Sequence, residues 1–290
     1  MKPAPFEYLD PRTVDAAVEI LARHGEEAKL LAGGQSLVPL MNMRLARPRR
    51  LVDLNRVGEL AYLRDDDGGL KIGAMTRQEA LEHSPLVATR CPLLRETTAL
   101  IGHPAIRNRG TIGGSLAHAD PAAELPAAIL ALDGRITATG PRGERTLPAE
   151  SFFAGALTTA LAPDEVLTRI ALPPLPPATG TCFLEVARRH GDFALVGVAA
   201  IVSARPDGAC GHARLAFCGA GDTPVRVERA EALLAGRRPD AGLLEAVQKL
   251  VSETLEPPSD LHASADYRRE VAGVLARRAL TLAWKRARHG

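Results

Sequence analysis

Two motifs with adjacent glycines constrain this chain more than any other feature. The first is Ala32-Gly33-Gly34-Gln35-Ser36, and the second, about eighty residues later, is Thr111-Ile112-Gly113-Gly114-Ser115. Because glycine has no Cβ atom, such a backbone can turn sharply and bring its N–H groups close to a ligand. Each motif alone is more typical of an ordinary turn. Together they suggest two loops on two sides of one polyanionic ligand.

The pattern of apolar residues places the first motif directly after a buried strand. The segments expected to be strands in this half are 29–31, 51–54, 61–63, 70–74, 135–139 and 166–172, and the expected helices are 14–24, 37–45, 76–83, 91–101 and 121–132. Pro39 is expected to break the helix that follows the first motif. Asp120 is expected to cap the helix that contains Glu124.

Four prolines among residues 173–177 form a stiff, extended linker and predict a domain boundary. We therefore expect a first domain over 1–175, divided into subdomains at about 1–55 and 56–175, and a second domain over 178–288. Strands are expected at 181–189, 195–204 and 213–218, followed by helices at 225–234, 241–253 and 264–288. The predicted class is α+β, with a three-stranded antiparallel sheet and helices in the second domain.

Composition excludes several classes of protein. A net charge of +2 argues against nucleic acid as a partner, because that would need a clustered basic excess. The sequence contains no run of eighteen apolar residues, so no integral membrane span is expected. No signal-peptide pattern is expected at the start of the sequence. The four cysteines form no Cys-x-x-Cys pair, so an iron–sulfur cluster within this chain is not expected. Reduced, mostly buried thiols indicate a cytoplasmic protein.

Both glycine motifs resemble those of the FAD-binding (medium) subunit of molybdenum hydroxylases, the carbon monoxide dehydrogenase and xanthine dehydrogenase family. That family carries Ala-Gly-Gly-His-Ser and Thr-Ile-Gly-Gly-Asn at matching places. The resemblance extends over nearly the whole chain. It includes Leu51-Val-Asp-Leu, Lys71-Ile-Gly-Ala-Met-Thr and Gly191-Asp-Phe-Ala.

The resemblance implies a fold and a cofactor. The fold is a two-subdomain FAD-binding domain of the vanillyl-alcohol-oxidase type, followed by a C-terminal domain like that of the carbon monoxide dehydrogenase flavoprotein. The cofactor is FAD, bound extended between the two subdomains. Neither glycine motif contains His or Cys, so the flavin is expected to be non-covalent. A Rossmann site is less favoured, because neither motif is Gly-x-Gly-x-x-Gly.

The resemblance also implies which residues bind FAD. Backbone N–H groups of the glycine motifs are expected to bind the pyrophosphate, helped by nearby hydroxyls. The expected cofactor-binding residues in and around the motifs are Leu31, Ala32, Gly33, Gly34, Gln35, Ser36, Leu37, Thr111, Gly113, Gly114 and Ser115. Ile101, Leu167 and Phe193 are expected to form the wall beside the isoalloxazine ring.

Glu124 matches the position of an acidic residue that binds the adenosine ribose in relatives, and the alternative is a helix-terminal acid that interacts only with the helix dipole. Ser115 stands where some relatives have Asn, and Phe193 stands where some have Tyr. Certain relatives show Lys near Glu185, and such a change of charge would alter the flavin potential. His103 and His118 flank the second motif and are further candidates for flavin contact.

The function implied is that of an electron-transfer subunit with no catalytic residue and no metal ligand of its own. A small subunit with [2Fe–2S] clusters would pass electrons to FAD from a large molybdopterin subunit, in an expected dimer of heterotrimers. FAD would deliver the electrons to an external acceptor. The alternatives are a stand-alone FAD-dependent oxidase or dehydrogenase, and a non-catalytic FAD-binding module.

Overall fold

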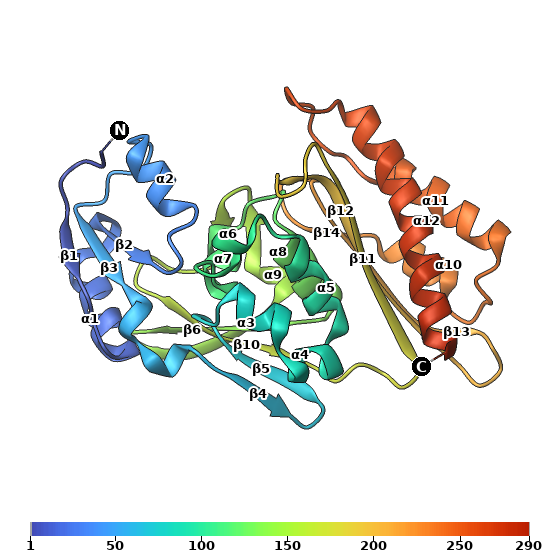
Figure 1. Ribbon diagram of the computed structural model, residues 1–290, viewed down its shortest axis with the longest axis horizontal. Helices are drawn as coiled ribbons and strands as arrows, with labels where there is room; N and C mark the ends of the chain where they lie inside the picture. Colours follow the sequence, from blue (N-terminus) through green and yellow to red (C-terminus); the bar gives the residue numbers. More distant parts are fainter. Residues whose placement is uncertain (1, 290) are drawn as a thin grey trace.

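Three larger sheets follow one another along the chain, each with its own helices (Figure 1), and a fourth sheet is only two-stranded. The computed structural model describes residues 2–289. The first sheet is the smallest of these three and contains β1 (Glu7–Leu9), β2 (Ala28–Leu31) and β3 (Arg50–Asp53). Its strand order is β1-β3-β2, and both outer strands run parallel to β3. Its helix α1 (Val14–His24) begins at the side-chain cap of Thr13 and ends at Gly25, whose φ is +52°.

The second sheet has five strands in the order β4-β5-β10-β6-β7, all antiparallel. Its strands are β4 (Leu63–Asp66), β5 (Gly69–Gly73), β6 (Arg135–Gly140), β7 (Gly143–Pro148) and β10 (Val166–Leu172). The helices that accompany it are α3 (Gln78–His83), α4 (Pro85–Arg90), α5 (Pro92–Leu100), α6 (Pro104–Arg107), α7 (Ile112–His118), α8 (Glu124–Ala131) and α9 (Ala149–Phe152). All eight residues of α8 are buried, so this helix is covered on every side.

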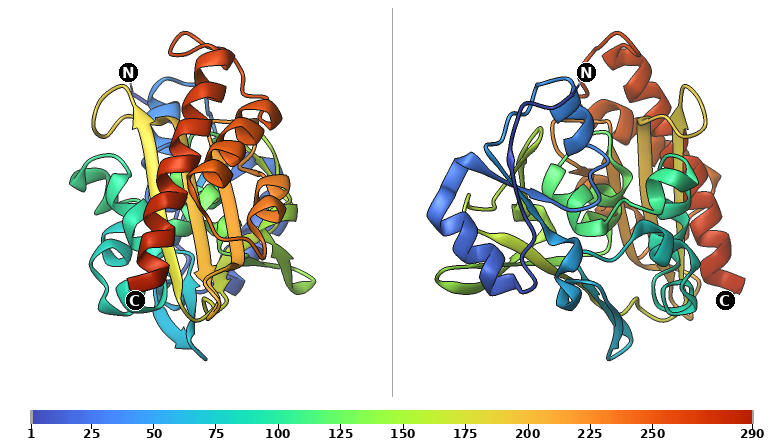
Figure 2. Two further views of the ribbon diagram at one scale, coloured as in Figure 1. Left: turned by 90° about the vertical axis from the view of Figure 1, so that its right-hand side faces the viewer. Right: turned by 60° about the vertical axis from the view of Figure 1, so that its left-hand side comes forward.

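The third sheet has the antiparallel order β11-β12-β13-β14. Its strands are β11 (Thr179–Ala187), β12 (Ala194–Ala204), β13 (Cys210–Cys218) and β14 (Val225–Arg226). Helices α11 (Ala241–Thr254) and α12 (Ala265–His289) cover one face, together with α10 (Glu228–Leu234), whereas α5 and α8 pack against the other (Figure 2). Because both faces are covered, every residue of β12 except the last is buried.

Short elements complete the chain. They are α2 (Leu37–Asn42), β8 (Phe153–Gly155), β9 (Thr158–Thr159) and three 3₁₀ turns at Gly25–Glu27, Leu54–Arg56 and Gly58–Leu60. No helix within residues 2–289 is long and apolar enough to cross a membrane. All four cysteines are buried and free, as expected.

The α+β class is confirmed, and several elements differ from expectation. Helices α4 and α6 and strand β7 were not expected. Helix α2 runs through Pro39 without a break, because Pro39 lies in its first turn, and it ends at Asn42. The second glycine motif is not a loop, because it opens helix α7. The predicted helix at 225–234 begins only at Glu228, and the residues before it form β14, a short fourth strand at the sheet edge. Asp120 is not the cap of α8: that helix begins after Ala123, and the Asp120 carboxylate accepts from the N–H of Ala122 at 2.9 Å.

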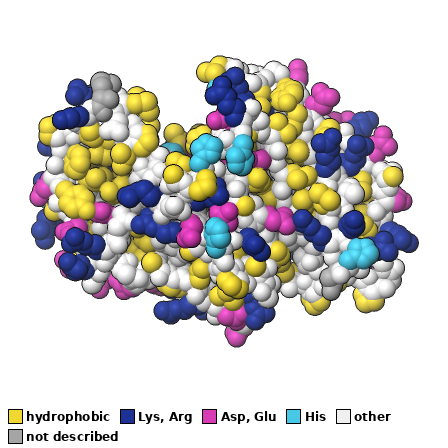
Figure 3. Space-filling model, viewed as in Figure 1, with side chains coloured by type: hydrophobic (Ala, Val, Ile, Leu, Met, Phe, Trp, Pro, Cys, Tyr) yellow, Lys and Arg dark blue, Asp and Glu magenta, His cyan; other side chains and the backbone are white. Residues whose placement is uncertain are grey.

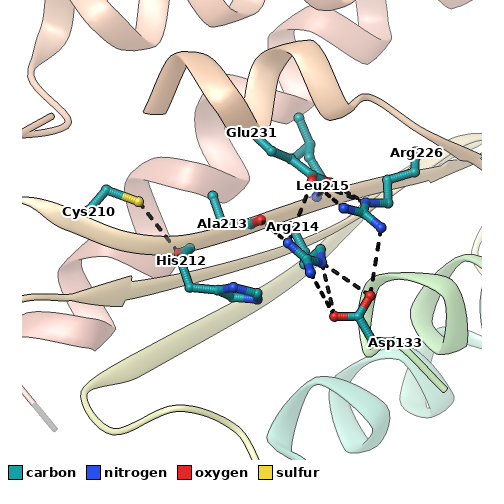
Figure 4. Close-up of polar contacts among 8 residues, drawn as sticks. All are labelled: Asp133, Cys210, His212, Ala213, Arg214, Leu215, Arg226 and Glu231. Atoms are coloured by element: carbon teal, nitrogen blue, oxygen red, sulfur yellow. Dashed lines mark hydrogen bonds and ion pairs between the residues drawn. The ribbon is translucent and has the colours of Figure 1, made fainter. Parts of the chain in front are cut away.

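An ion network ties α8 to the third sheet (Figure 4). Asp133, just after α8, accepts from Arg214 Nε at 3.0 Å. Arg226 joins Asp133 to Glu231: its Nη1 lies 3.7 Å from Asp133, and its Nε donates to Glu231 at 2.8 Å. Glu231 is almost fully buried and also accepts from the N–H of Leu215 at 3.0 Å. The network therefore fixes α8 against the C-terminal strands.

Candidate functional site

The two glycine motifs touch one another. A Cβ atom added to Gly33 would lie 2.4 Å from the carbonyl oxygen of Arg109 and 2.7 Å from Cα of Gly110. A Cβ added to Gly114 would lie 3.2 Å from Cβ of Ala32. Only glycine permits this approach of two backbones, and the two motifs therefore lie in contact.

The second motif uses its own N–H groups for packing. Thr111 caps α7 by accepting from Gly114 N at 3.0 Å, and its carbonyl accepts from Ser115 N at 3.1 Å. Gly113 N donates to Ala74 O at 2.8 Å, and Ile112 N donates to Thr76 O at 3.1 Å. All four N–H groups therefore have protein acceptors, and their expected contact with the pyrophosphate stays a prediction.

The first motif has the opposite character. Within residues 2–289, the N–H groups of five successive residues, Gly33 to Leu37, have no protein acceptor. Gly34 has a φ of +74°, in the left-handed region, and Ser36 has a right-handed conformation. Loops that combine these two conformations are typical of anion-binding sites made of backbone N–H groups. Gln35 folds back, with Nε2 donating to Gly33 O at 2.9 Å. This row of free donors, here called the Gly33–Leu37 cradle, is suited to an anion with several oxygens.

Glu124 lies in a buried seam between α8 and the third sheet. It is the first residue of α8 and only 4% exposed. The N–H of Gly219 donates to Pro121 O at 2.7 Å, which fixes the start of α8 beside the end of β13. Across the sheet, Glu185 pairs with Gly197 and Gly197 pairs with Cys218. The seam therefore brings two carboxyls and a thiol close together.

Burial dominates the chemistry of the seam. It raises the pKa of Glu124 to about 7, and the nearby charge of Asp120 adds to the effect. Burial and the neighbouring Glu124 raise the pKa of Glu185 to about 8. The Oε2 atom of Glu185 is buried and has no hydrogen-bond partner within the described residues. Such an orphaned polar atom is costly unless a ligand or proton satisfies it.

The expected flavin wall is assembled only in part. Gly191 packs against His103: a Cβ at Gly191 would lie 2.5 Å from Cε1 of that ring. The His103 segment, which includes Ile101, therefore meets the segment that contains Phe193. Phe193 is 61% exposed, so most of its side chain faces solvent. Leu167 is buried in β10 next to Thr168, whose carbonyl accepts from Ala74 N at 3.0 Å, close to the second motif.

Three further site predictions concern Ser115, His118 and Leu31. Ser115 and His118 belong to α7, in its first and last turns, and both are partly exposed. Leu31 ends β2 and packs under Gly34, where a Cβ would lie 3.2 Å from Leu31 Cδ1. Their contacts with flavin stay predictions, as do those of the other expected site residues.

Sequence reasoning missed Asn55 and Arg77, which contact the backbone beside the cradle. They lie far from both glycine motifs in the sequence and match no motif, so no local signal marks them. The surface is indented between the lobe that carries α2 and the rest of the chain, and acidic and basic side chains are mixed over this face (Figure 3).

Comparison with known families places both parts of the chain. Residues 4–175 match the FAD binding domain in molybdopterin dehydrogenase, and residues 181–283 match the CO dehydrogenase flavoprotein C-terminal domain.

Individual relatives agree over the full length. The chain is 43% identical to the 6-hydroxypseudooxynicotine dehydrogenase complex subunit alpha of Paenarthrobacter nicotinovorans, covering 99% of this chain and 97% of that one. It is 39% identical to the carbon monoxide dehydrogenase medium chain of Hydrogenophaga pseudoflava, with 99% of each covered. A solved structure of carbon monoxide dehydrogenase from that organism superposes with a TM-score of 0.96 at 40% identity, covering 99% of both chains. The chain therefore belongs to the family of FAD-binding medium subunits of molybdenum-containing dehydrogenases.

Proposed function

We propose that the chain binds FAD non-covalently and passes electrons from the [2Fe–2S] clusters of a partner subunit to an external acceptor. The observation that carries the proposal is the Gly33–Leu37 cradle, five consecutive N–H donors without a protein acceptor among the described residues. A dinucleotide pyrophosphate has negatively charged oxygens that such donors satisfy.

The residues of the site fit FAD in two ways. The cradle supplies hydrogen-bond donors for the pyrophosphate. The buried seam offers Glu185 Oε2, an atom that lacks a partner in the protein itself. When bound, FAD supplies the redox centre, and the protein supplies its binding, orientation and electrostatic surroundings.

Glu124 and Glu185 are neighbours, so they contact the same portion of an extended dinucleotide. We propose that Glu124 in this seam binds the hydroxyls of the adenosine ribose. The test measures how much Glu124→Gln weakens the affinity for FAD, which contains that ribose, and for FMN, which lacks it. A loss about tenfold to a hundredfold larger for FAD assigns Glu124 to the adenosine ribose, as expected for charge-assisted hydrogen bonds. Equal losses for both flavins contradict the adenosine assignment.

The partners we propose are a large molybdopterin subunit and a small [2Fe–2S] subunit, assembled as a dimer of heterotrimers. The names of the relatives support this, since they describe a medium chain and a subunit of a dehydrogenase complex. The four free, buried thiols fit a reducing compartment, which supports a cytoplasmic location.

Anaerobic flavin bleaching tests the electron-transfer role. We expect the isolated, FAD-loaded chain to show no substrate-dependent bleaching with aldehydes, purines or carbon monoxide. Addition of the matching iron–sulfur and molybdenum subunits should permit rapid reduction by the substrate of the complex. Rapid bleaching of the isolated chain by a small organic substrate would instead establish a stand-alone oxidase or dehydrogenase. Failure of the purified chain to bind FAD would overturn the proposal altogether.

A further inference from the structure

A chain of side-chain hydrogen bonds supports the cradle from behind. Asn55, just after β3, donates through Nδ2 to the carbonyl of Ala32 at 3.0 Å. Arg77, just before α3, donates through Nη2 to Asn55 Oδ1 at 2.5 Å and through Nη1 to the carbonyl of Arg109. Ala32 directly precedes the cradle, and the Arg109 carbonyl is the atom that Gly33 packs against. One guanidinium therefore connects both sides of the contact between the glycine motifs.

We propose that Arg77 is a positioning residue that holds the two glycine motifs together and thereby keeps the Gly33–Leu37 cradle in its ligand-binding conformation. The inference rests on the proposed binding of FAD at this cradle. Arg77 itself need not touch the cofactor, because it acts through Asn55 and through the Arg109 carbonyl.

The backbone of Arg77 is anchored on the side of the second motif. Arg77 and Thr111 form an antiparallel bridge, and the next residue, Gln78, donates its N–H to Gly110 O at 2.9 Å. The side chain of Arg77 then reaches Asn55, which belongs to the lobe that carries the first motif. Arg77 thus links the first-sheet lobe to the second-sheet lobe at the point where each supplies a glycine motif.

The acceptor Asn55 is itself held in place. Its backbone N–H and its side-chain Nδ2 both donate to Asp53 Oδ1, at 2.8 Å and 2.5 Å, and Tyr8 donates its hydroxyl to Asp53 Oδ2 at 2.6 Å. A side chain fixed in this way loses little further freedom when it binds Arg77. The support for the cradle therefore extends from β1 through β3 to the start of α3.

Arginine suits this position better than lysine. The planar guanidinium presents several N–H donors in a fixed arrangement, so it can bind a carbonyl and an amide oxygen at once. Burial lowers the pKa of Arg77, and the positive charge of Arg109 lowers it further, whereas Asp53 opposes the change. Keeping the Arg77 guanidinium charged in this place therefore costs free energy. Such a cost is consistent with a role that depends on the geometry of the hydrogen bonds that the guanidinium forms.

The test compares Arg77→Gln and Arg77→Lys with the wild-type chain. Arg90→Gln is the matched control, because Arg90 forms an exposed ion pair with Asp65 at 2.5 Å. FAD affinity is measured by flavin fluorescence on the purified full chain. We expect Arg77→Gln to weaken FAD about tenfold to a hundredfold, Arg77→Lys to be intermediate, and Arg90→Gln to match the wild type.

Hydrogen exchange of the FAD-free chain gives a readout that does not depend on the cofactor. The amides of Val38 and Leu40 donate to Gly34 O and Ser36 O, each at 3.1 Å, and so report the order of the cradle. Arg77→Gln should speed their exchange, while amides of β12 keep wild-type protection. A structural role confined to global stability would instead accelerate both sets together.

The outcomes separate this inference from the proposed function. If the wild-type chain binds FAD and Arg77→Gln binds it equally well with unchanged exchange, the positioning role is wrong. If the wild-type chain binds no FAD, the proposed function fails, and the exchange comparison alone decides the role of Arg77. If Arg77→Gln does not fold, Asn55→Ala, which breaks the same connection from the other side, should give the same loss of FAD affinity. Wild-type affinity in Asn55→Ala would then refute the inference.

Discussion

Replacement of Glu185 by glutamine should flatten the dependence of stability on pH. The pKa of this carboxyl is raised from the ordinary 4.5 to about 8 by burial and by Glu124. Between these two values the folded chain keeps the proton that the unfolded chain releases. Stability therefore falls as pH rises through this window, and the loss is complete above the folded pKa. Glutamine carries no titrating proton and lacks this loss.

The magnitude follows from the pKa difference. Each tenfold change in proton affinity is worth about 1.4 kcal/mol, so the difference between 4.5 and about 8 sets an upper limit of roughly 5 kcal/mol. Part of the Glu185 side chain reaches solvent, and its titration is coupled to that of Glu124. Both reduce the expected effect, to about 2 kcal/mol at pH 8.5.

Urea unfolding of the FAD-free chain, followed by circular dichroism at pH 5, 7 and 8.5, measures the effect. Glu185→Gln and the wild type should be similarly stable at pH 5, and the variant should be more stable at pH 8.5. Glu245→Gln, which alters an exposed carboxylate on α11, serves as the control and should follow the wild type. Parallel pH profiles for Glu185→Gln and wild type would refute the buried-acid reasoning.

Two further changes test the contacts between parts of the chain. Gly33→Ala places a methyl group 2.4 Å from the Arg109 carbonyl and should weaken FAD at least tenfold in a fluorescence titration, whereas Gly58→Ala, with open space around it, should not. Asp133→Asn keeps the left-handed conformation at φ +51° but removes the charge facing Arg214 and Arg226. It should lower the free energy of unfolding by about 1 kcal/mol in low salt, and a loss that salt does not reduce would contradict the ionic origin.

Periodicity was sufficient to predict most long elements. The apolar stripe of α1 depends on local sequence, which is why it matches the structure closely, and the strands expected at 181–189 and 213–218 overlap β11 and β13. The edge strand β14 is only two residues long, and its pairing with β13 sets it apart from the helix that follows. That pairing is a tertiary contact, so no local pattern could distinguish the strand from the start of a helix.

The sequence predicted that the two glycine motifs belong to the candidate site, but it could not predict which motif has free N–H groups. The two glycine motifs are nearly alike as sequences, yet one has its N–H groups free and the other has them bonded to Thr111, Ala74 and Thr76. This difference depends on which residues pack against each motif. The acid seam was equally hidden, because Glu124 and Glu185 are neighbours only after the third sheet has packed on α8.

The position of α8 between two layers has a consequence for synthesis of the chain. One apolar core contains residues of α8, such as Leu125 and Ile129, together with Phe183, Ala199 and Cys218 of the third sheet. The ribosome makes those strands about fifty or more residues after α8. Until they emerge, the surface of α8 that they cover stays in contact with water or with a chaperone. A nascent chain that stops in the proline-rich linker would therefore present an apolar helix to its neighbours, and such intermediates are the ones that aggregate.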